Sequence, residues 1–422
     1  MSYKISEHKL EQSVLHIPEG VRDIYNGECE QKLSVQESMH RVFKSYGFCD
    51  IQTPMFEFFD VFNQERGTIP SREMFKFFDR YGNTMVLRPD ITPSIARCFG
   101  KYYKEEGLPL RLCYAGNTFI NSSSYQGKLK ETTQLGAELI NDATVDADAE
   151  MIALTIDCLK SSGLKEFQIE IGHADFLNGI LEEADFDEEE TQELKMLIEK
   201  KNVFGVEELI SEKKLSEDLK TLILKIADMF GDIENIKNAK KLTASKRALK
   251  AVDRLEKLYA ILDGYGLSGY ITFDLGLLSK YNYYTGIIYK AYTYGTGEPI
   301  VKGGRYDNLM EQFGKEAPAI GLAIEVDQLM IALRRQKIEP KLEKAGTCIL
   351  YEKKFRKTAI ELAGILRKQG KKVMLIRKSE DFSLEDYIKH VSKFSVGEVL
   401  YVDNEDSVPS MEEFIDNEST AK

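Results

Sequence analysis

The order of four short motifs is the feature that most constrains the fold of this chain. Each motif combines charged or aromatic residues with glycine, proline or apolar neighbours, and each by itself is weak. In chain order they read EGVRD at Glu19–Asp23, LRPDIT at Leu87–Thr92, QLGAE at Gln134–Glu138, and YYTG at Tyr283–Gly286 followed by GGRYD at Gly303–Asp307. Their order and spacing together predict a single domain that contains all four.

Alternating apolar residues predict the strands of this domain. Two strand-like segments, Leu110–Phe119 and Thr133–Ile140, flank a polar loop and are expected to pair. Similar signals recur at residues 167–171, 270–273, 286–294, 299–302 and 319–324. A sheet flanked by helices is therefore expected.

Changes in pattern predict the domain boundaries. Residues 175–262 lose the strand signals, and residues such as Leu194 and Leu197 recur at helical spacing, which predicts a helical insertion within a core domain of residues 1–336. Residues 337–346 are polar and are expected to form a linker. Residues 347–422 alternate strand, helix, strand, helix and strand, which predicts a small α/β domain with a mostly parallel sheet.

Composition argues against several classes of function. The chain has 422 residues and a formal net charge of −12, which argues against nucleic acid as a partner. The N-terminus has no apolar core of a signal peptide, and no apolar run approaches the ~20 residues that a membrane helix needs. The six cysteines and five histidines show no metal-ligand spacing, so we expect a cytoplasmic protein without a metal site.

Residues 264–269 read GYGLSG and match the GxGxxG pattern of dinucleotide sites. In such sites the pattern follows a strand and opens a helix, so that the helix N-terminus meets the pyrophosphate. Here a predicted helix ends before the pattern and a predicted strand follows it. These residues are therefore expected to form a helix end and a turn.

The four motifs resemble the core of the class II aminoacyl-tRNA synthetases, and most closely that of the histidyl enzymes. The resemblance implies an α+β fold with a class II antiparallel sheet core flanked by helices, a helical insertion, and a C-terminal domain like a shortened anticodon-binding domain. The synthetases usually have Glu at the position of Asp90. The resemblance also implies a pocket for free histidine, with these candidate residues: Asp90, Thr92, Gln134, Glu138, Tyr283, Tyr284, Arg88 and Arg305.

These residue types suit an amino-acid ligand. The carboxylates of Asp90 and Glu138 could pair with an α-ammonium group, and if buried they need such a cation to offset their desolvation. The amide and hydroxyl groups of the other motif residues can donate or accept hydrogen bonds, and the tyrosines supply flat walls with polar tips. Taken singly, each tyrosine or threonine is equally compatible with ordinary strand packing.

Three positions depart from the chemistry of an active synthetase. Ile120 replaces the arginine that binds the α-phosphate, Ser279 replaces an arginine beside the activated carboxylate, and Gln328 replaces the closing arginine of the third class II motif. Loss of one transition-state donor typically costs ~10²–10³ in rate, so the loss of all three predicts negligible adenylation. Lys128 and Lys130 are flexible point charges and do not reproduce a bidentate guanidinium.

A synthetase-like core without activation chemistry resembles the regulatory subunits of ATP phosphoribosyltransferase. The segments at residues 114–119, 282–287 and 302–309 are similar to phrases of that family. The resemblance implies a role in the first step of histidine biosynthesis, with no catalytic residue, no cofactor, and free histidine as the effector. It implies a short-form catalytic subunit as the partner, and a homodimer, built on the helix at residues 29–46, within a hetero-oligomer expected to be a hetero-octamer.

Two other functions remain open at this point. The first is an active histidyl-tRNA synthetase, which histidine-dependent ATP–pyrophosphate exchange would reveal. The second is an RNA-binding sensor of uncharged tRNA, suggested by basic residues of the C-terminal domain: Lys353, Lys354, Arg356, Lys357, Lys371 and Lys372. Most of these residues are expected at helix ends or on a solvated face, which argues against a nucleic-acid surface.

Overall fold

The computed structural model describes residues 15–62, 69–122, 128–211, 213–277, 283–340, 342, 346–394 and 396–404. Ser279, the leader before residue 15, part of the predicted linker and the tail after Asn404 lie outside these residues. Contacts divide the chain into two compact units, described separately below: residues 1–22 with 36–339, and residues 23–35 with 340–422.

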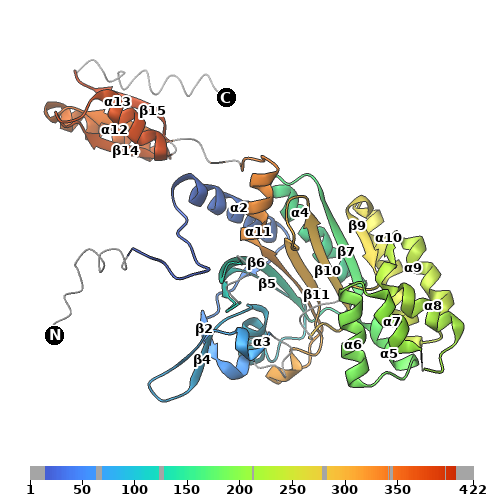
Figure 1. Cartoon of the computed structure of the whole chain (residues 1–422). Coiled ribbons are helices and arrows are strands. Elements are labelled where there is room, and N and C mark those ends of the chain that lie inside the picture. The colour runs from blue at the N-terminus through green and yellow to red at the C-terminus, as the bar shows by residue number, and fades with distance from the viewer. Residues whose placement is uncertain are drawn as a thin grey trace, which may run out of the picture. The chain divides into compact units, whose positions relative to one another are not determined.

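A nine-stranded sheet forms the centre of the larger unit (Figure 1). In sheet order, its strands are β1 (Cys49–Asp50), β5 (Leu110–Phe119), β6 (Glu131–Ile140), β12 (Ala319–Glu325), β11 (Val301–Arg305), β10 (Ile287–Thr293), β7 (Phe167–His173), β9 (Ile271–Asp274) and β8 (Phe230–Gly231). Within the run of six strands from β5 to β7, every neighbouring pair is antiparallel. Each of the seven predicted strand segments falls on one of these strands.

The sheet is mixed, although an antiparallel one was expected. Strand β1 pairs with β5 in parallel, and β9 pairs with β7 in parallel. Parallel neighbours need a long crossover connection. Here the small sheet and α3 (Thr92–Tyr102) connect β1 to β5, while the helical insertion connects β7 to β9. The parallel pairs therefore occur where the chain leaves the large sheet and returns to it.

Long helices flank the sheet because their apolar residues are spaced to face it. Helix α4 (Val145–Ser161) is buried along most of its length and contacts β12, and the side chain of Thr144 caps its first turn. Helix α11 (Val326–Arg335) contacts β6. The C-terminal half of α2 (Asn26–Ser45) buries Met39 and Phe43. No helix among the described residues combines the length and hydrophobicity that crossing a bilayer requires.

Six helices follow β7 and gather beside the β9–β8 edge of the sheet (Figure 1). They are α5 (Ala174–Glu183), α6 (Glu188–Glu199), α7 (Val203–Ile210), α8 (Glu217–Lys225), α9 (Ile233–Ala239) and α10 (Lys246–Gly264). Side chains of Asp187, Asn202, Ser216, Asp232 and Ser245 cap α6 to α10 in turn. Caps of this kind satisfy the free N–H groups at a helix start. The two-residue strand β8, between α8 and α9, was not predicted.

Helix α10 ends at Gly264, inside the GYGLSG segment, and β9 begins soon after it. Gly266 has a φ of 71°, a left-handed conformation that favours glycine at the end of a helix. The prediction of a helix end and a turn is therefore confirmed, and no helix N-terminus is available here for a pyrophosphate.

A small antiparallel sheet leads into the second motif. It has the order β2 (Phe56–Phe58), β4 (Thr84–Leu87), β3 (Lys76–Phe78). The β3–β4 turn contains Gly82 at a φ of 85°, and Asp79 accepts hydrogen bonds from the backbone N–H groups of Tyr81 and Asn83. The sequence Tyr81-Gly82-Asn83 supplies residue types that favour such a turn. The hairpin ends directly before Arg88 and Asp90.

The smaller unit contains a three-stranded parallel sheet in the order β14 (Val373–Arg377), β13 (Gly346–Tyr351), β15 (Val396–Val402). Helix α12 (Arg356–Lys368) connects β13 to β14, and α13 (Leu384–Val391) precedes β15. Ile349 of β13 and the apolar face of α12 share one buried cluster. The predicted alternation and parallel pairing are both present.

Candidate functional site

A pocket opens on one face of the large sheet, bounded by β6, β11, β12 and the start of α3. Alternate residues of a strand share a face, which brings Gln134 and Glu138 of β6 together. Six of the eight side chains predicted for a histidine pocket line this cavity: Asp90, Thr92, Gln134, Glu138, Tyr283 and Tyr284. The second, third and fourth motifs thus meet in space, although almost 200 residues separate Asp90 from Tyr283, whereas no residue of the first motif is among the lining residues that the structure describes.

Glu138 is the most deeply buried carboxylate of the cavity, with 1% of its surface exposed. Its Oε1 accepts a hydrogen bond from Thr92 Oγ1 at 2.9 Å, and its Oε2 accepts one from the Tyr306 hydroxyl. Burial raises the pKa of Glu138 to about 8, although both hydrogen bonds act in the opposite direction. An extra positive charge in the cavity would therefore stabilise the ionised form of Glu138.

Gly321 of β12 has no side chain, which leaves the space that the Glu138 carboxylate occupies. A Cβ atom at Gly321 would lie 1.7 Å from Glu138 Oε2, so no larger residue fits while the carboxylate keeps this position. The close approach of the two strands, which pair Gly321 with Glu138, is the reason. The glycine is a steric requirement of the pocket.

Asp90 is the second buried carboxylate. Its Oδ2 accepts a hydrogen bond from the Tyr283 hydroxyl at 3.0 Å, and its Oδ1 accepts one from the backbone N–H of Ile91 at 2.8 Å. Burial raises its pKa. The Tyr283 ring lies 4.9 Å from the Tyr284 ring and 5.9 Å from the Tyr306 ring, centroid to centroid, so aromatic walls surround the polar groups.

A third carboxylate and one cation complete the lining. Glu325 Oε1 accepts hydrogen bonds from Lys302 Nζ at 3.0 Å and from Gln134 Nε2 at 3.2 Å. The other amide atom of Gln134, Oε1, is buried and has no hydrogen-bond partner among the described residues. Among the described residues that line the cavity, Lys302 is the only cation beside three carboxylates.

Sequence reasoning missed three polar residues of this lining: Lys302, Tyr306 and Glu325. Tyr306 belongs to the GGRYD motif itself, and Lys302 directly precedes that motif. Strand alternation from Gly304 to Lys302 could have placed Lys302 on the same face. Glu325 pairs with Gln134 across β12 and β6, a register that the sequence does not reveal.

Arg88 does not line the cavity, which corrects its prediction as a pocket residue. Its Nε donates to the backbone carbonyl of Asn117 at 2.8 Å, and its Nη1 donates to that of Thr53 at 2.9 Å. Arg88 is 5% exposed, and its guanidinium connects three segments of the core. Because carbonyl acceptors direct it away from the neighbouring Asp90, its role here is structural.

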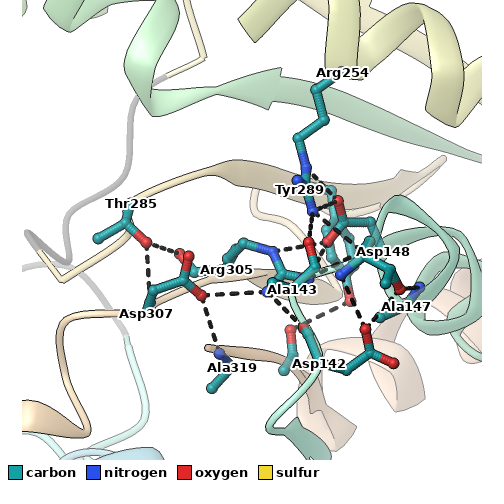
Figure 2. A network of polar contacts seen from close by, with 12 residues as sticks. Asp142, Ala143, Ala147, Asp148, Arg254, Thr285, Tyr289, Arg305, Asp307 and Ala319 are labelled. Carbon is teal, nitrogen blue, oxygen red and sulfur yellow. Dashed lines mark hydrogen bonds and ion pairs between the residues drawn. The ribbon is translucent and has the colours of Figure 1, made fainter. Parts of the chain in front are cut away.

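Arg305 was also predicted for the pocket and lies instead in a separate buried network (Figure 2). Its Nε and Nη2 contact Asp148 Oδ1 at 2.9 and 2.6 Å, while Arg254 Nε of α10 contacts Asp148 Oδ2 at 2.7 Å. Arg305 also donates to the backbone carbonyl of Asp142 at 2.8 Å. The network connects β11, α4 and the helical insertion.

The positions expected to have lost a catalytic arginine are partly described. Ile120 packs against an apolar cluster that contains Val86 and Phe62. Gln328 lies on α11, half-buried, and Ser279 is outside the described residues. Lys128 forms an ion pair with Glu298. None of the described residues among these lines the cavity.

One group of potential metal ligands exists among the described residues: His40, Asp50 and Cys113. Asp50 already accepts hydrogen bonds from His40 Nε2 at 2.5 Å and Lys44 Nζ at 3.0 Å. Burial, with the charge of Asp50, raises the pKa of the Cys113 thiol to about 12, which opposes the thiolate form that binds metals. Hydrogen bonds explain this cluster, and we assign no metal to it.

Comparison with known proteins places this chain in a family. The histidyl-tRNA synthetase family model matches residues 20–329. The ATP phosphoribosyltransferase regulatory subunit of Acetivibrio thermocellus is 41% identical over 394 residues, which cover 93% of this chain and 94% of that protein. The chain belongs to the family of ATP phosphoribosyltransferase regulatory subunits. The regulatory subunit of Ruminiclostridium cellulolyticum is 39% identical over 398 residues, with 93% and 94% of the two chains covered.

A solved structure agrees with this regulatory-subunit family. The crystal structure of an ATP phosphoribosyltransferase regulatory subunit/histidyl-tRNA synthetase from Bacillus halodurans C is 32% identical in sequence and has a TM-score of 0.82. The match covers 92% of this chain and 99% of that one. The class II synthetase-like α+β fold expected from the motifs is therefore confirmed.

Proposed function

We propose that this chain is the regulatory subunit of an ATP phosphoribosyltransferase, the enzyme that condenses ATP with phosphoribosyl pyrophosphate in the first step of histidine biosynthesis. It acts in the cytoplasm, in a complex with a short-form catalytic subunit. It has no catalytic residue and no cofactor of its own. Homodimers of the chain, built on α2 and the strand that follows, assemble with the catalytic subunits into a hetero-octamer.

One observation carries the non-catalytic part of this proposal. The cavity keeps side chains that suit an amino acid, whereas position 120 is an apolar contact with Val86 and its neighbours. Nucleotide activation needs fixed positive charge on the phosphate oxygens as negative charge develops. The single lysine in the lining is bonded to Glu325 and does not replace a set of arginines. Aminoacylation is therefore lost.

Free histidine is the effector, and it occupies the cavity. Its α-ammonium group pairs with Asp90 and Glu138 and contacts Gln134 Oε1, which has no hydrogen-bond partner among the described residues. The ammonium group supplies the positive charge that the buried carboxylates lack. If histidine binds one quaternary state more tightly, it shifts the complex toward that state. Feedback inhibition then follows from binding alone, without chemistry in this subunit.

Co-expression with a short-form catalytic subunit tests the assembly. We expect the two proteins to co-elute in size-exclusion chromatography, with a mass by light scattering that matches a hetero-octamer. The complex should form phosphoribosyl-ATP faster than the catalytic subunit alone. Two proteins that never co-elute would refute the proposed function. Histidine-dependent ATP–pyrophosphate exchange by the folded chain would instead support an active synthetase.

Titration with histidine tests the effector site. Calorimetry should show binding to the chain, and Glu138→Gln should weaken it by roughly tenfold or more, because a charge-assisted contact is lost. Glu131→Gln is the matched control, since Glu131 lies on the same strand but does not line the cavity. Equal affinities in wild type and Glu138→Gln would place the effector site elsewhere.

A further inference from the structure

The Lys302–Glu325 ion pair is the part of the cavity that the sequence motifs did not predict. Lys302 Nζ lies 3.0 Å from Glu325 Oε1, and the two side chains are 33% and 12% exposed. Burial opposes the lysine charge, but the carboxylates of Glu325, Glu298 and Asp90 together raise the pKa of Lys302. The lysine is thus a charged group at the open side of an otherwise acidic pocket.

The chemistry of an amino acid explains why such a pair would line a pocket. A zwitterion carries an ammonium group and a carboxylate on the same carbon, so its site needs acidic and basic groups close together. The acidic groups are Asp90 and Glu138, and Gln134 Oε1 is a buried acceptor without a partner. Among the described residues of the lining, Lys302 is the one cation.

This inference rests on the proposed binding of histidine in the cavity. We propose that Lys302 binds the α-carboxylate of the effector, and that Glu325 forms an ion pair with Lys302 while the pocket is empty. At the position of Ser279 the synthetases have an arginine beside the ligand carboxylate, and this chain has no cation there. Lys302 supplies the positive charge instead. Glu325 is an internal competitor of the ligand carboxylate.

The exchange of carboxylates gives the ligand a direct connection to α11. Glu325 is the last residue of β12 and directly precedes α11, whose residue Asp327 accepts a hydrogen bond from the backbone N–H of Thr133 at 2.7 Å. When the ligand carboxylate binds Lys302, Glu325 keeps the hydrogen bond from Gln134 Nε2 and loses its ion pair with the Lys302 ammonium group. Histidine therefore changes the electrostatic environment at the start of α11.

Histidine and histamine differ only in the carboxylate. Comparing their affinities separates a contact between Lys302 and the carboxylate from general damage to the pocket. Histamine is histidine without its carboxylate, so it tests the ammonium and imidazole contacts alone. We expect Lys302→Met to weaken histidine binding by about tenfold or more and to change histamine binding by less than about threefold. Lys302→Arg keeps a cation and should retain most of the histidine affinity.

Two further variants sharpen the measurement. Glu325→Gln removes the competing carboxylate and should strengthen histidine binding several-fold, with no gain for histamine. Lys290→Met is the control, because Lys290 pairs with Lys302 on the neighbouring strand, carries the same charge, and does not line the cavity. It should change histidine affinity by less than about threefold.

The outcomes distinguish this inference from the function on which it rests. Equal losses of histidine and histamine in Lys302→Met, or no loss of either, would overturn the carboxylate role and leave the proposed effector site intact. Histidine binding that is insensitive to Glu138→Gln would overturn the effector site, and this inference with it. Circular dichroism of each variant establishes that the protein is folded.

Discussion

Two groups of buried charges in the larger unit differ in the number of cations that accompany their carboxylates. In the Asp148 network, one carboxylate with 0% of its side chain exposed lies between two guanidinium groups, those of Arg254 and Arg305. In the cavity, the carboxylates of Asp90, Glu138 and Glu325 share a single lysine. Asp148 therefore has two cationic partners from the chain, whereas among the described residues of the cavity lining three carboxylates share one cation.

At both places burial favours the neutral form of a titratable group, and it raises the pKa of Asp148 although two guanidinium groups act in the opposite direction. His173 lies near the network, where burial and the charges of Arg254, Arg305 and Arg247 lower its pKa to about 3, so the imidazole is neutral. In the cavity, burial raises the pKa of Glu138 to about 8. A buried ion whose partners are all supplied by the chain stabilises the fold, whereas an unbalanced group of buried ions indicates a place for a ligand.

Replacing Asp148 by Asn should have the largest effect on stability. The amide cannot neutralise two guanidinium groups, one of which, on Arg305, is almost fully buried. Removal of one partner from a buried ion pair typically costs ~3–5 kcal/mol, so we expect a loss of that size in the free energy of unfolding. Urea unfolding followed by circular dichroism measures it.

Asp146→Asn is the control for that measurement. Asp146 lies on the same helix, in its first turn, and is exposed. Loss of its interaction with the helix dipole is worth about 1 kcal/mol at most. If the Asp148 variant were no less stable than this control, the network would not be the structural element described here.

Arg88→Met should have the next largest effect, and only on stability. Its guanidinium satisfies the carbonyls of Thr53 and Asn117, and loss of a hydrogen bond from a charged group costs ~1.5–3 kcal/mol. Histidine affinity by calorimetry should not change, because Arg88 does not line the cavity. Arg80→Met, at an exposed position in the same hairpin, should leave both quantities unchanged. Weaker histidine binding in the Arg88 variant would show that Arg88 contributes to the pocket.

The same contrast explains which parts of the site the sequence predicts. Asp90, Glu138 and Gln134 were predicted from motifs that resemble the histidine pocket of the synthetases, and their residue types suit an amino-acid ligand. Arg88 and Arg305 belong to the same motifs, but their acceptors, such as Asn117 and Asp148, come from distant segments. Chain proximity to a pocket residue does not fix the direction of a long side chain.

The fold shows a similar limit. Strand β5 spans Leu110–Phe119, the predicted bounds. Strand β8 has two residues, too few to show any period, and its place at the edge of the sheet depends on a partner far along the chain. Periodicity therefore predicted the long central strands and missed this short edge strand.

Per pH unit, the smallest expected effect is a change in the pH dependence of stability in the absence of histidine. The pKa of Glu138 is raised from 4.5 to about 8 by folding, so between these values the folded chain keeps a proton that the unfolded chain releases. The stabilisation from this proton is complete below about pH 4.5 and is lost as the pH rises to about 8. One proton gives a slope of up to ~1.4 kcal/mol per pH unit.

Glu138→Gln removes this titration, because the amide is neutral at every pH. The free energy of unfolding of the variant should therefore fall less steeply between pH 5 and pH 8 than that of the wild type, as measured by urea unfolding. Glu105→Gln, which removes the same charge from an exposed position, should leave the wild-type slope unchanged. Equal slopes in wild type and the Glu138 variant would mean that the chain already balances this carboxylate, as it does Asp148, and the distinction between the two groups of buried charges would fail.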